Sequence, residues 1–330
     1  ANSRDPNAGM HAEAILQRME EQYKLGNRDV ERNNLSYNSA ITAWANTQDP
    51  NAGMHAEALL RRMEELSKMG NLEVKPDTTT YNRAITAWAN SRDAKAGARA
   101  EALLKLMEEQ YKMGNEDVKP NTITYNTAIT AWANSRNSSA GIRAEAILQQ
   151  MQQQFDAGNK NVKPNTVTCS SVISAWAKSY HPDAGSRGER ILRQMQELWA
   201  AGNVNVKPTT VTFNAAINAW GNVRDPQRVA RAQALLKEMQ QLHRSGGREV
   251  RPDVLTYNSL IHVLINSDDP SAAGEQADKY LQEMKNENIK PNAFVYTNMI
   301  KAWSRCKGPN AKERIKELNS YLKHLGQRRR

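Results

Sequence analysis

The chain has 330 residues and a formal net charge of +10, with 45 lysines and arginines against 35 aspartates and glutamates. No apolar run approaches the length of a membrane span, and the mean hydropathy of −0.76 fits a thin fold with much exposed surface, so no membrane partner is expected. Cys169 and Cys306 are too few for a disulfide framework, which favours a reducing compartment.

One segment recurs along the chain at a fixed interval of 44 residues. Its tryptophan stands at Trp44, Trp88, Trp132, Trp176 and Trp220. A fixed period of this size indicates an array of like units. Dividing the chain after each recurring proline gives the repeats 34–77, 78–121, 122–165, 166–209, 210–253, 254–292 and 293–330.

The first 33 residues match the back part of a repeat, because residues 1–5 copy residues 89–93. The chain is therefore expected to begin inside a partial repeat, 1–33, and to be a piece of a longer array. No linker long enough to divide the array is evident. We therefore expect one elongated domain over 1–330.

Each repeat is predicted to form two helices. In repeat 78–121 two apolar sets recur at helical spacing, namely Tyr81, Ala84, Ile85 and Trp88, then Ala100, Leu103, Leu104, Met107 and Tyr111. Such hairpins bury their apolar faces by stacking, so the sequence predicts an all-α fold, an α-solenoid of stacked helix-turn-helix repeats with almost no strand. The recurring tryptophans are predicted core residues, as are Tyr23, Tyr111, Phe155 and Trp199, which share one slot of the second helix.

Basic residues also recur, directly before the loop proline of each repeat. They are Lys75, Lys119, Lys163, Lys207, Arg251 and Lys290. Positive charge repeated along a solenoid forms a stripe that suits a phosphate backbone. The alternative is a set of solvated loop residues with no partner.

The ends of the repeats carry a family resemblance. A repeat opens with a threonine-rich turn and an aromatic-Asn pair, as in Thr122-Ile123-Thr124-Tyr125-Asn126, and closes as in Val118-Lys119-Pro120-Asn121. This pattern resembles the pentatricopeptide repeat (PPR) family over essentially the whole chain, although the family's usual repeat is shorter than 44 residues. The resemblance implies a right-handed superhelix. Tetratricopeptide repeats, which bind peptides, are the neighbouring possibility, but both repeat ends favour the pentatricopeptide family.

The resemblance implies that each repeat reads one RNA base with two side chains. One follows the opening aromatic and the other follows the closing proline. The implied pairs are Asn38 with Asp77, Asn82 with Asn121, Asn126 with Asn165, Ser170 with Thr209, Asn214 with Asp253, and Asn258 with Asn292, while Thr297 begins a last repeat with no assigned partner. In the family, Asn with Asp tends to select uracil and Asn with Asn cytosine, so the implied site is 5′-UCCNUC.

A third set of side chains would wedge against the bases. The resemblance places it two residues before the opening aromatic, at Leu35, Thr79, Ile123, Val167, Val211, Leu255 and Phe294. Contact of this kind with a base contributes about 1–3 kcal/mol.

Both polar columns also have a structural interpretation. The residues after the prolines stand just before a predicted helix, where Asp, Asn and Thr are preferred caps. The Asn column could bond to its own helix backbone. Both columns vary only among residue types that can read a base, and this favours RNA.

Catalytic machinery is not evident. The sequence has no Cys-x-x-Cys, Gly-rich phosphate loop or Ser-His-Asp candidate, and its histidines show no metal-ligand spacing. We expect no enzymatic activity, metal or cofactor. The expected function is sequence-preferring binding of single-stranded RNA, and the family resemblance implies a role in a mitochondrion or plastid, in RNA processing, stability, editing or translation. The alternatives are a protein-binding scaffold within an organellar ribonucleoprotein assembly such as a ribosome, and a catalytic protein whose enzyme domain lies outside this segment.

Overall fold

The computed structural model describes residues 5–27, 29–30, 33–269, 271–306 and 310–327, which are helical and contain no strand. The α-helices are α1 (Ala8–Lys24), α2 (Asn34–Asn46), α3 (Ala52–Lys68), α4 (Thr78–Ser91), α5 (Ala96–Lys112), α6 (Thr122–Ser135), α7 (Ala140–Asp156), α8 (Thr166–Ser179), α9 (Ala184–Ala200), α10 (Thr210–Gly221), α11 (Arg228–Arg244), α12 (Val254–Ile265), α13 (Ala273–Asn286), α14 (Ala293–Ser304) and α15 (Asn310–Gln327). Short 3₁₀ helices follow α3, α5, α9 and α11, at Leu72–Val74 (η1), Glu116–Val118 (η2), Val204–Val206 (η3) and Arg248–Val250 (η4).

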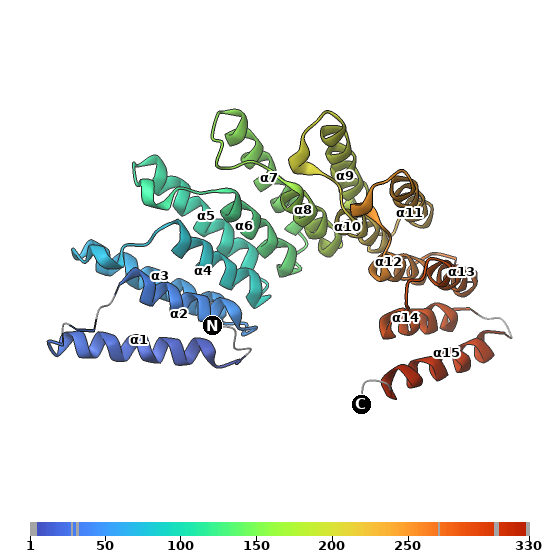
Figure 1. The fold of residues 1–330 in the computed structure, drawn as a ribbon, viewed down its shortest axis with the longest axis horizontal. Helices are drawn as coiled ribbons and strands as arrows, with labels where there is room; N and C mark the ends of the chain where they lie inside the picture. Colours follow the sequence, from blue (N-terminus) through green and yellow to red (C-terminus); the bar gives the residue numbers. More distant parts are fainter. Residues whose placement is uncertain (1–4, 28, 31–32, 270, 307–309, 328–330) are drawn as a thin grey trace. The chain divides into compact units, whose positions relative to one another are not determined.

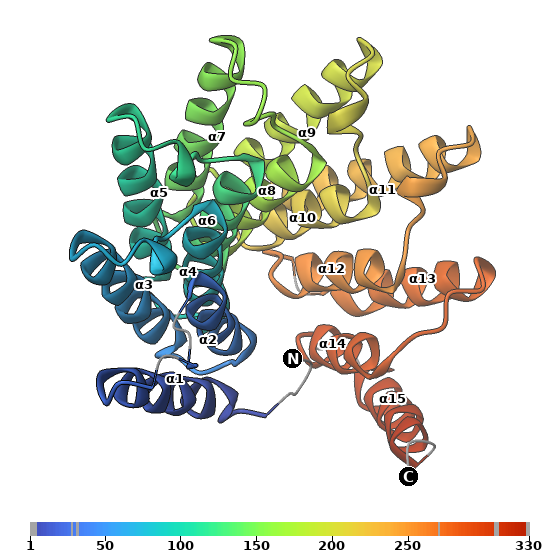
Figure 2. The ribbon, with the colours of Figure 1, turned by 60° about the vertical axis from the view of Figure 1, so that its left-hand side comes forward.

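The helices pair into hairpins, and the hairpins stack within two compact units, Ala1–Ala175 and Trp176–Arg330. In the first unit the opening helices α2, α4 and α6 pack in a row, and the closing helices α3, α5 and α7 lie against them (Figures 1 and 2). In the second unit α10, α12 and α14 form the row, covered by α9, α11, α13 and α15. This two-layer packing confirms the predicted all-α solenoid. The single domain and the superhelical hand stay predictions.

The predicted core of the first helix is confirmed. Tyr81 and Ile85 have no exposed surface, and Trp88 exposes 4%. Cys169, which stands where other repeats have the aromatic, is buried as well, and this burial raises the pKa of its thiol to about 12.

The prediction that a second aromatic slot belongs to the core is wrong. Trp199 is 39% exposed, and Tyr23, Tyr111 and Phe155 are only half-buried. These residues lie near the C-terminal ends of 17-residue closing helices, and the opening helices have at most 14 residues. The last turn of a closing helix therefore lies beyond the face that packs, and its aromatic ring stays partly in solvent.

Glycines in the closing helices make room for the recurring tryptophans. A Cβ added at Gly97 of α5 would lie 2.3 Å from Cδ2 of Trp132 in α6, far inside van der Waals contact. The same close approach recurs between Gly9 and Trp44, Gly53 and Trp88, Gly185 and Trp220, and Gly274 and Trp303. The glycine lets the flat indole lie directly on the helix backbone, which fixes the distance between consecutive hairpins.

At Trp88, Trp132 and Trp220 a carboxylate joins the indole to an arginine of the next closing helix, and at Trp44 the carboxylate of Glu13 joins the indole to His55. Oε2 of Glu101, which is 8% exposed, accepts hydrogen bonds from Trp132 Nε1 at 3.0 Å and from Arg143 Nε at 3.1 Å. Arg143 donates a second bond to Oε1 at 2.5 Å. Burial of the charge is tolerated because it is paired and hydrogen-bonded. We call this arrangement the Trp–carboxylate–Arg network; it joins α5, α6 and α7.

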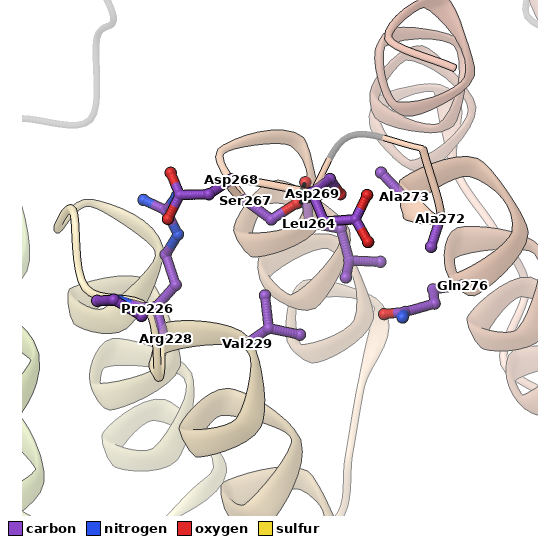
Figure 3. Close-up of a pocket in the computed structure, with 10 residues that line it drawn as sticks. All are labelled: Pro226, Arg228, Val229, Leu264, Ser267, Asp268, Asp269, Ala272, Ala273 and Gln276. Atoms are coloured by element: carbon purple, nitrogen blue, oxygen red, sulfur yellow. Dashed lines mark hydrogen bonds and ion pairs between the residues drawn. The ribbon is translucent and has the colours of Figure 1, made fainter. Parts of the chain in front are cut away.

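Two positions in the second unit depart further from this network. Asp278 binds Arg314 through both oxygens, but Trp303 Nε1 is buried with no partner among the described residues. At the preceding hairpin Leu264 replaces the tryptophan, and Val229 and Gln233 replace the glycine and the glutamate. A cavity of about 290 Å³ remains there, and Figure 3 shows Val229 and Leu264 in its wall beside the Arg228–Asp268 ion pair at 2.8 Å.

Replacing Gly97 by Ala should destabilise the fold by about 1–3 kcal/mol, since the new methyl group overlaps the indole of Trp132. Helix propensity alone predicts the opposite sign. Urea denaturation followed by circular dichroism measures the change. In a Trp132→Leu background the same substitution should cost little, and additive effects of the two substitutions would contradict the steric account.

Replacing Asp278 by Glu should stabilise the second unit by about 1 kcal/mol, because the longer side chain can accept from Trp303 Nε1 and keep Arg314. Thermal denaturation of the variant checks this. The reverse change, Glu101→Asp, should destabilise the chain. A lower melting temperature for the Asp278→Glu variant would show that the length of the carboxylate is not what leaves the indole unpaired.

Candidate nucleic-acid interface

The residue after each loop proline caps the next opening helix. Asp77 Oδ1 accepts from Thr80 N at 2.8 Å, and Asn121 Oδ1 accepts from Thr124 N at 3.1 Å. The equivalent bonds join Asn165 to Thr168, Asp253 to Thr256 and Asn292 to Val295, and Thr209 forms a capping box with Thr212. The capping interpretation of this column is thus confirmed. It uses one side-chain oxygen and leaves the second polar atom of each Asp or Asn.

The closing loop is held against the start of its own repeat. Thr78 Oγ1 donates to the carbonyl of Lys119 at 2.9 Å, and Thr210 Oγ1 donates to that of Arg251 at 2.7 Å. Val118 and Pro120, on either side of Lys119, are buried. Asn121 is therefore fixed beside the N-terminal end of α4.

These contacts bring the two polar columns together. Asn214 Nδ2 donates to Asp253 Oδ1 at 3.1 Å, and Asn126 Nδ2 donates to Asn165 Oδ1 at 3.4 Å. Asn258 instead accepts from Asn298 of the next opening helix at 3.0 Å.

Several residues of the first column, the one that follows the opening aromatic, are more buried than expected for side chains that contact a base. Asn38 and Asn214 expose 6% and 8% of their surface, and Ser170 is also buried. The side-chain oxygens of Asn38, Asn82 and Asn214 have no hydrogen-bond partner within the described residues. Thr297 donates its hydroxyl to Ala293 of its own helix at 2.8 Å. Three of the seven residues of the first column are therefore buried, and the other four are half-buried, as all six residues of the second column are.

The predicted wedge residues form an exposed column, one on the first turn of each opening helix. Six of them expose between 57% and 75% of their surface: Leu35, Ile123, Val167, Val211, Leu255 and Phe294. Thr79, the seventh, is exposed as well. Apolar side chains left in water in six of seven repeats are typical of a binding surface.

Sequence reasoning missed the residues that hold the first column from the next repeat. Thr168 Oγ1 donates to Asn126 Oδ1 at 2.6 Å, and Arg83 donates to the carbonyl of Asn38 at 2.9 Å. The threonine recurs at the third position of the opening helices and is fully buried at Thr80, Thr124, Thr168, Thr212 and Thr256. That recurrence was the available signal.

The described residues contain no group of three or more His, Cys, Asp or Glu side chains placed to hold a metal ion. Each helix in the described ranges is too short or too polar to cross a lipid bilayer.

Comparison with known proteins places the chain by family and fold. The PPR repeat family model matches residues 252–305, and the pentatricopeptide repeat domain model matches 110–178 and 155–223. No curated protein sequence matches. The crystal structure of the pentatricopeptide repeat protein PPR10 from maize is similar over 97% of this chain, with 21% identity and a TM-score of 0.54.

PPR10 in complex with an 18-nucleotide psaJ RNA element is also similar, at 16% identity, 98% coverage of this chain and a TM-score of 0.37. The chain spans 39% of the first PPR10 structure and 49% of the second. The matched segments, the stacked hairpins and the shared fold agree: the chain belongs to the pentatricopeptide repeat family.

Proposed function

We propose that this chain binds single-stranded RNA and reads about one base per repeat. The observation that carries the proposal is that each capping Asp or Asn has one side-chain polar atom fixed by the helix and one left over, two residues before an exposed wedge side chain. The net charge of +10 favours a polyanionic partner. The wedge column offers each base an apolar contact, and the leftover polar atoms offer it a hydrogen bond.

The helix cap fixes which atom is left over. A backbone N–H donates only to an acceptor, so a capping Asn must use Oδ1 and turns its Nδ2 donor away from the helix. A capping Asp uses one oxygen and keeps a second acceptor. Asp77 and Asp253 therefore present acceptors, which suit the N3–H donor of uracil. Asn121, Asn165 and Asn292 present donors, which suit the N3 acceptor of cytosine.

The pattern of caps supports the order 5′-UCCNUC along repeats 34–292. Thr209 carries a hydroxyl that both donates and accepts, so its repeat has no defined preference. Each hydrogen-bonded base is discriminated by about 1–3 kcal/mol. Membership of the pentatricopeptide repeat family supports a role in mitochondrial or plastid RNA processing, stability, editing or translation.

A second candidate function is a protein-binding scaffold within a ribonucleoprotein assembly. The observation that favours it is a set of apolar side chains at the projecting ends of the closing helices. Met69, Leu72 and Met113 expose 78%, 73% and 79% of their surface. These ends belong to the part of the repeat that exceeds the family's usual length. Binding of RNA with no preference among sequences would favour this function over base reading.

Replacing Asp77 by Asn should change the preferred first base from uracil to cytosine, since the acceptor facing the base becomes a donor. Gel-shift titration of wild type and variant with 5′-UCCNUC and 5′-CCCNUC measures the effect. We expect each protein to prefer its matching RNA by about 5-fold or more. A purine-substituted RNA is the control. The same preference in wild type and variant would contradict base reading by Asp77.

Asn121 allows capping to be separated from reading. Asn121→Asp keeps the cap and should leave the free energy of unfolding nearly unchanged, while Asn121→Ala should lose about 1 kcal/mol. Chemical denaturation compares the three proteins, and RNA titration follows on the same samples. If Asn121→Asp binds 5′-UCCNUC and 5′-UUCNUC as wild type does, Asn121 is a cap and nothing more.

A further inference from the structure

The basic residues before the loop prolines are not equivalent in the structure. Lys75 Nζ lies 2.5 Å from Asp117 Oδ2, and Lys207 Nζ lies 2.8 Å from Glu249 Oε1. In both cases the carboxylate comes from the closing loop of the following repeat, 42 residues along the chain. Each of these two cations is therefore already next to an opposite charge, and the pair as a whole is neutral.

Lys119 and Lys163 lack this neutralisation. The positions 42 residues beyond them carry Asn161 and Asn205, in place of the carboxylates. Neither lysine has a carboxylate oxygen within 4.0 Å in the described ranges. They are consecutive members of the column, and both lie in the first compact unit. The difference follows from single amide-for-acid changes in an otherwise repeated loop.

Aromatic rings hold these two lysines in place. Lys119 Nζ lies 4.9 Å from the centroid of the Tyr111 ring, and Lys163 Nζ lies 5.7 Å from that of Phe155. A cation over a ring face is attracted electrostatically, so part of the side chain's freedom is lost before any ligand arrives. Hydrogen bonding to Tyr111 raises the pKa of Lys119, which keeps its ammonium charged. This explains why half-buried aromatics recur in a slot that the core does not fill.

Each of the two lysines also belongs to a loop that carries a cap residue. Lys119 precedes the cap residue Asn121 by two positions, and Lys163 precedes Asn165 by two. Their carbonyls accept hydrogen bonds from Thr78 and Thr122 at 2.9 and 3.2 Å, so the loop backbone is held at both places.

We propose that Lys119 and Lys163 bind RNA phosphates and that Lys75 and Lys207, held by carboxylates of neighbouring loops, do not. This inference rests on the proposed RNA-binding function. It assigns phosphate binding to members of the basic column that have no carboxylate partner among the described residues, instead of to every member of the column. The aromatic ring is not the deciding element, since Lys207 also lies over one, Trp199, at 5.5 Å. The carboxylate is.

The test is the salt dependence of binding to 5′-UCCNUC RNA, followed by fluorescence anisotropy. Removing one lysine that binds a phosphate should reduce the slope of log K against log salt concentration by about 0.7. Lys119→Met and Lys163→Met should each show this reduction, and Lys75→Met and Lys207→Met should not. Circular dichroism spectra confirm that each variant is folded.

Two charge changes at the partner positions sharpen the test. Asn161→Asp places a carboxylate opposite Lys119 and should reduce the slope as Lys119→Met does. Glu249→Gln removes the carboxylate beside Lys207 and should increase the slope by about 0.7. The control for net charge is Glu275→Gln, an exposed acid on α13, which should leave the slope unchanged.

The outcomes separate this inference from the proposed function. If wild type binds the RNA and all four lysine variants show the same reduction in slope, the inference is overturned and RNA binding stands. Unchanged slopes for Lys119→Met and Lys163→Met lead to the same conclusion. Wild type that binds no RNA at low salt overturns both.

Discussion

From α4 onward each opening helix begins with backbone N–H groups that have no partner within the helix, and the residue after the loop proline accepts a hydrogen bond from at least one of them. This requirement determines the geometry of the candidate site. The cap fixes the rotamer of the Asp or Asn. The loop that carries the cap residue is also held, because the first residue of its repeat's opening helix donates a hydrogen bond to a carbonyl of that loop. The remaining polar atom therefore has a defined position and a defined character, donor or acceptor. The capping side chain is therefore already ordered, and its second polar atom needs no further loss of rotamer freedom to bind a ligand.

Regular spacing of these caps depends on the tryptophans. A tryptophan on a glycine sets the separation of two hairpins, and the buried carboxylate ties the indole to the next closing helix. Where Leu264 replaces the indole, its partners change with it and a cavity remains. The substitutions at Val229 and Gln233 show that the three positions act as one packing unit. We expect hairpins that keep these three residues to place their caps and wedge residues at a regular spacing.

Much of the fold could be predicted because its signals are periodic. The core tryptophans and the capping column recur at a fixed interval, and only burial or helix ends explain residues of those types. The aromatic slot at Tyr111, Phe155 and Trp199 was mispredicted, since helical spacing shows which face a residue lies on and not where the neighbouring helix ends. The ion pairs of Lys75 and Lys207 and the burial of Asn38 depend on contacts between different repeats, which periodicity within one repeat does not reveal.

The central claim is that the protein and the RNA are collinear. Successive repeats contact successive bases, and the order of the repeats along the chain follows the RNA from 5′ to 3′. Photo-crosslinking with 4-thiouridine at the first or the fifth position of 5′-UCCNUC, followed by mass spectrometry of the crosslinked peptides, tests it most directly. We expect the first position to crosslink near Leu35 and Thr79, and the fifth near Val211 and Leu255. Crosslinks in the opposite order, or from both positions to the same peptides, would contradict it.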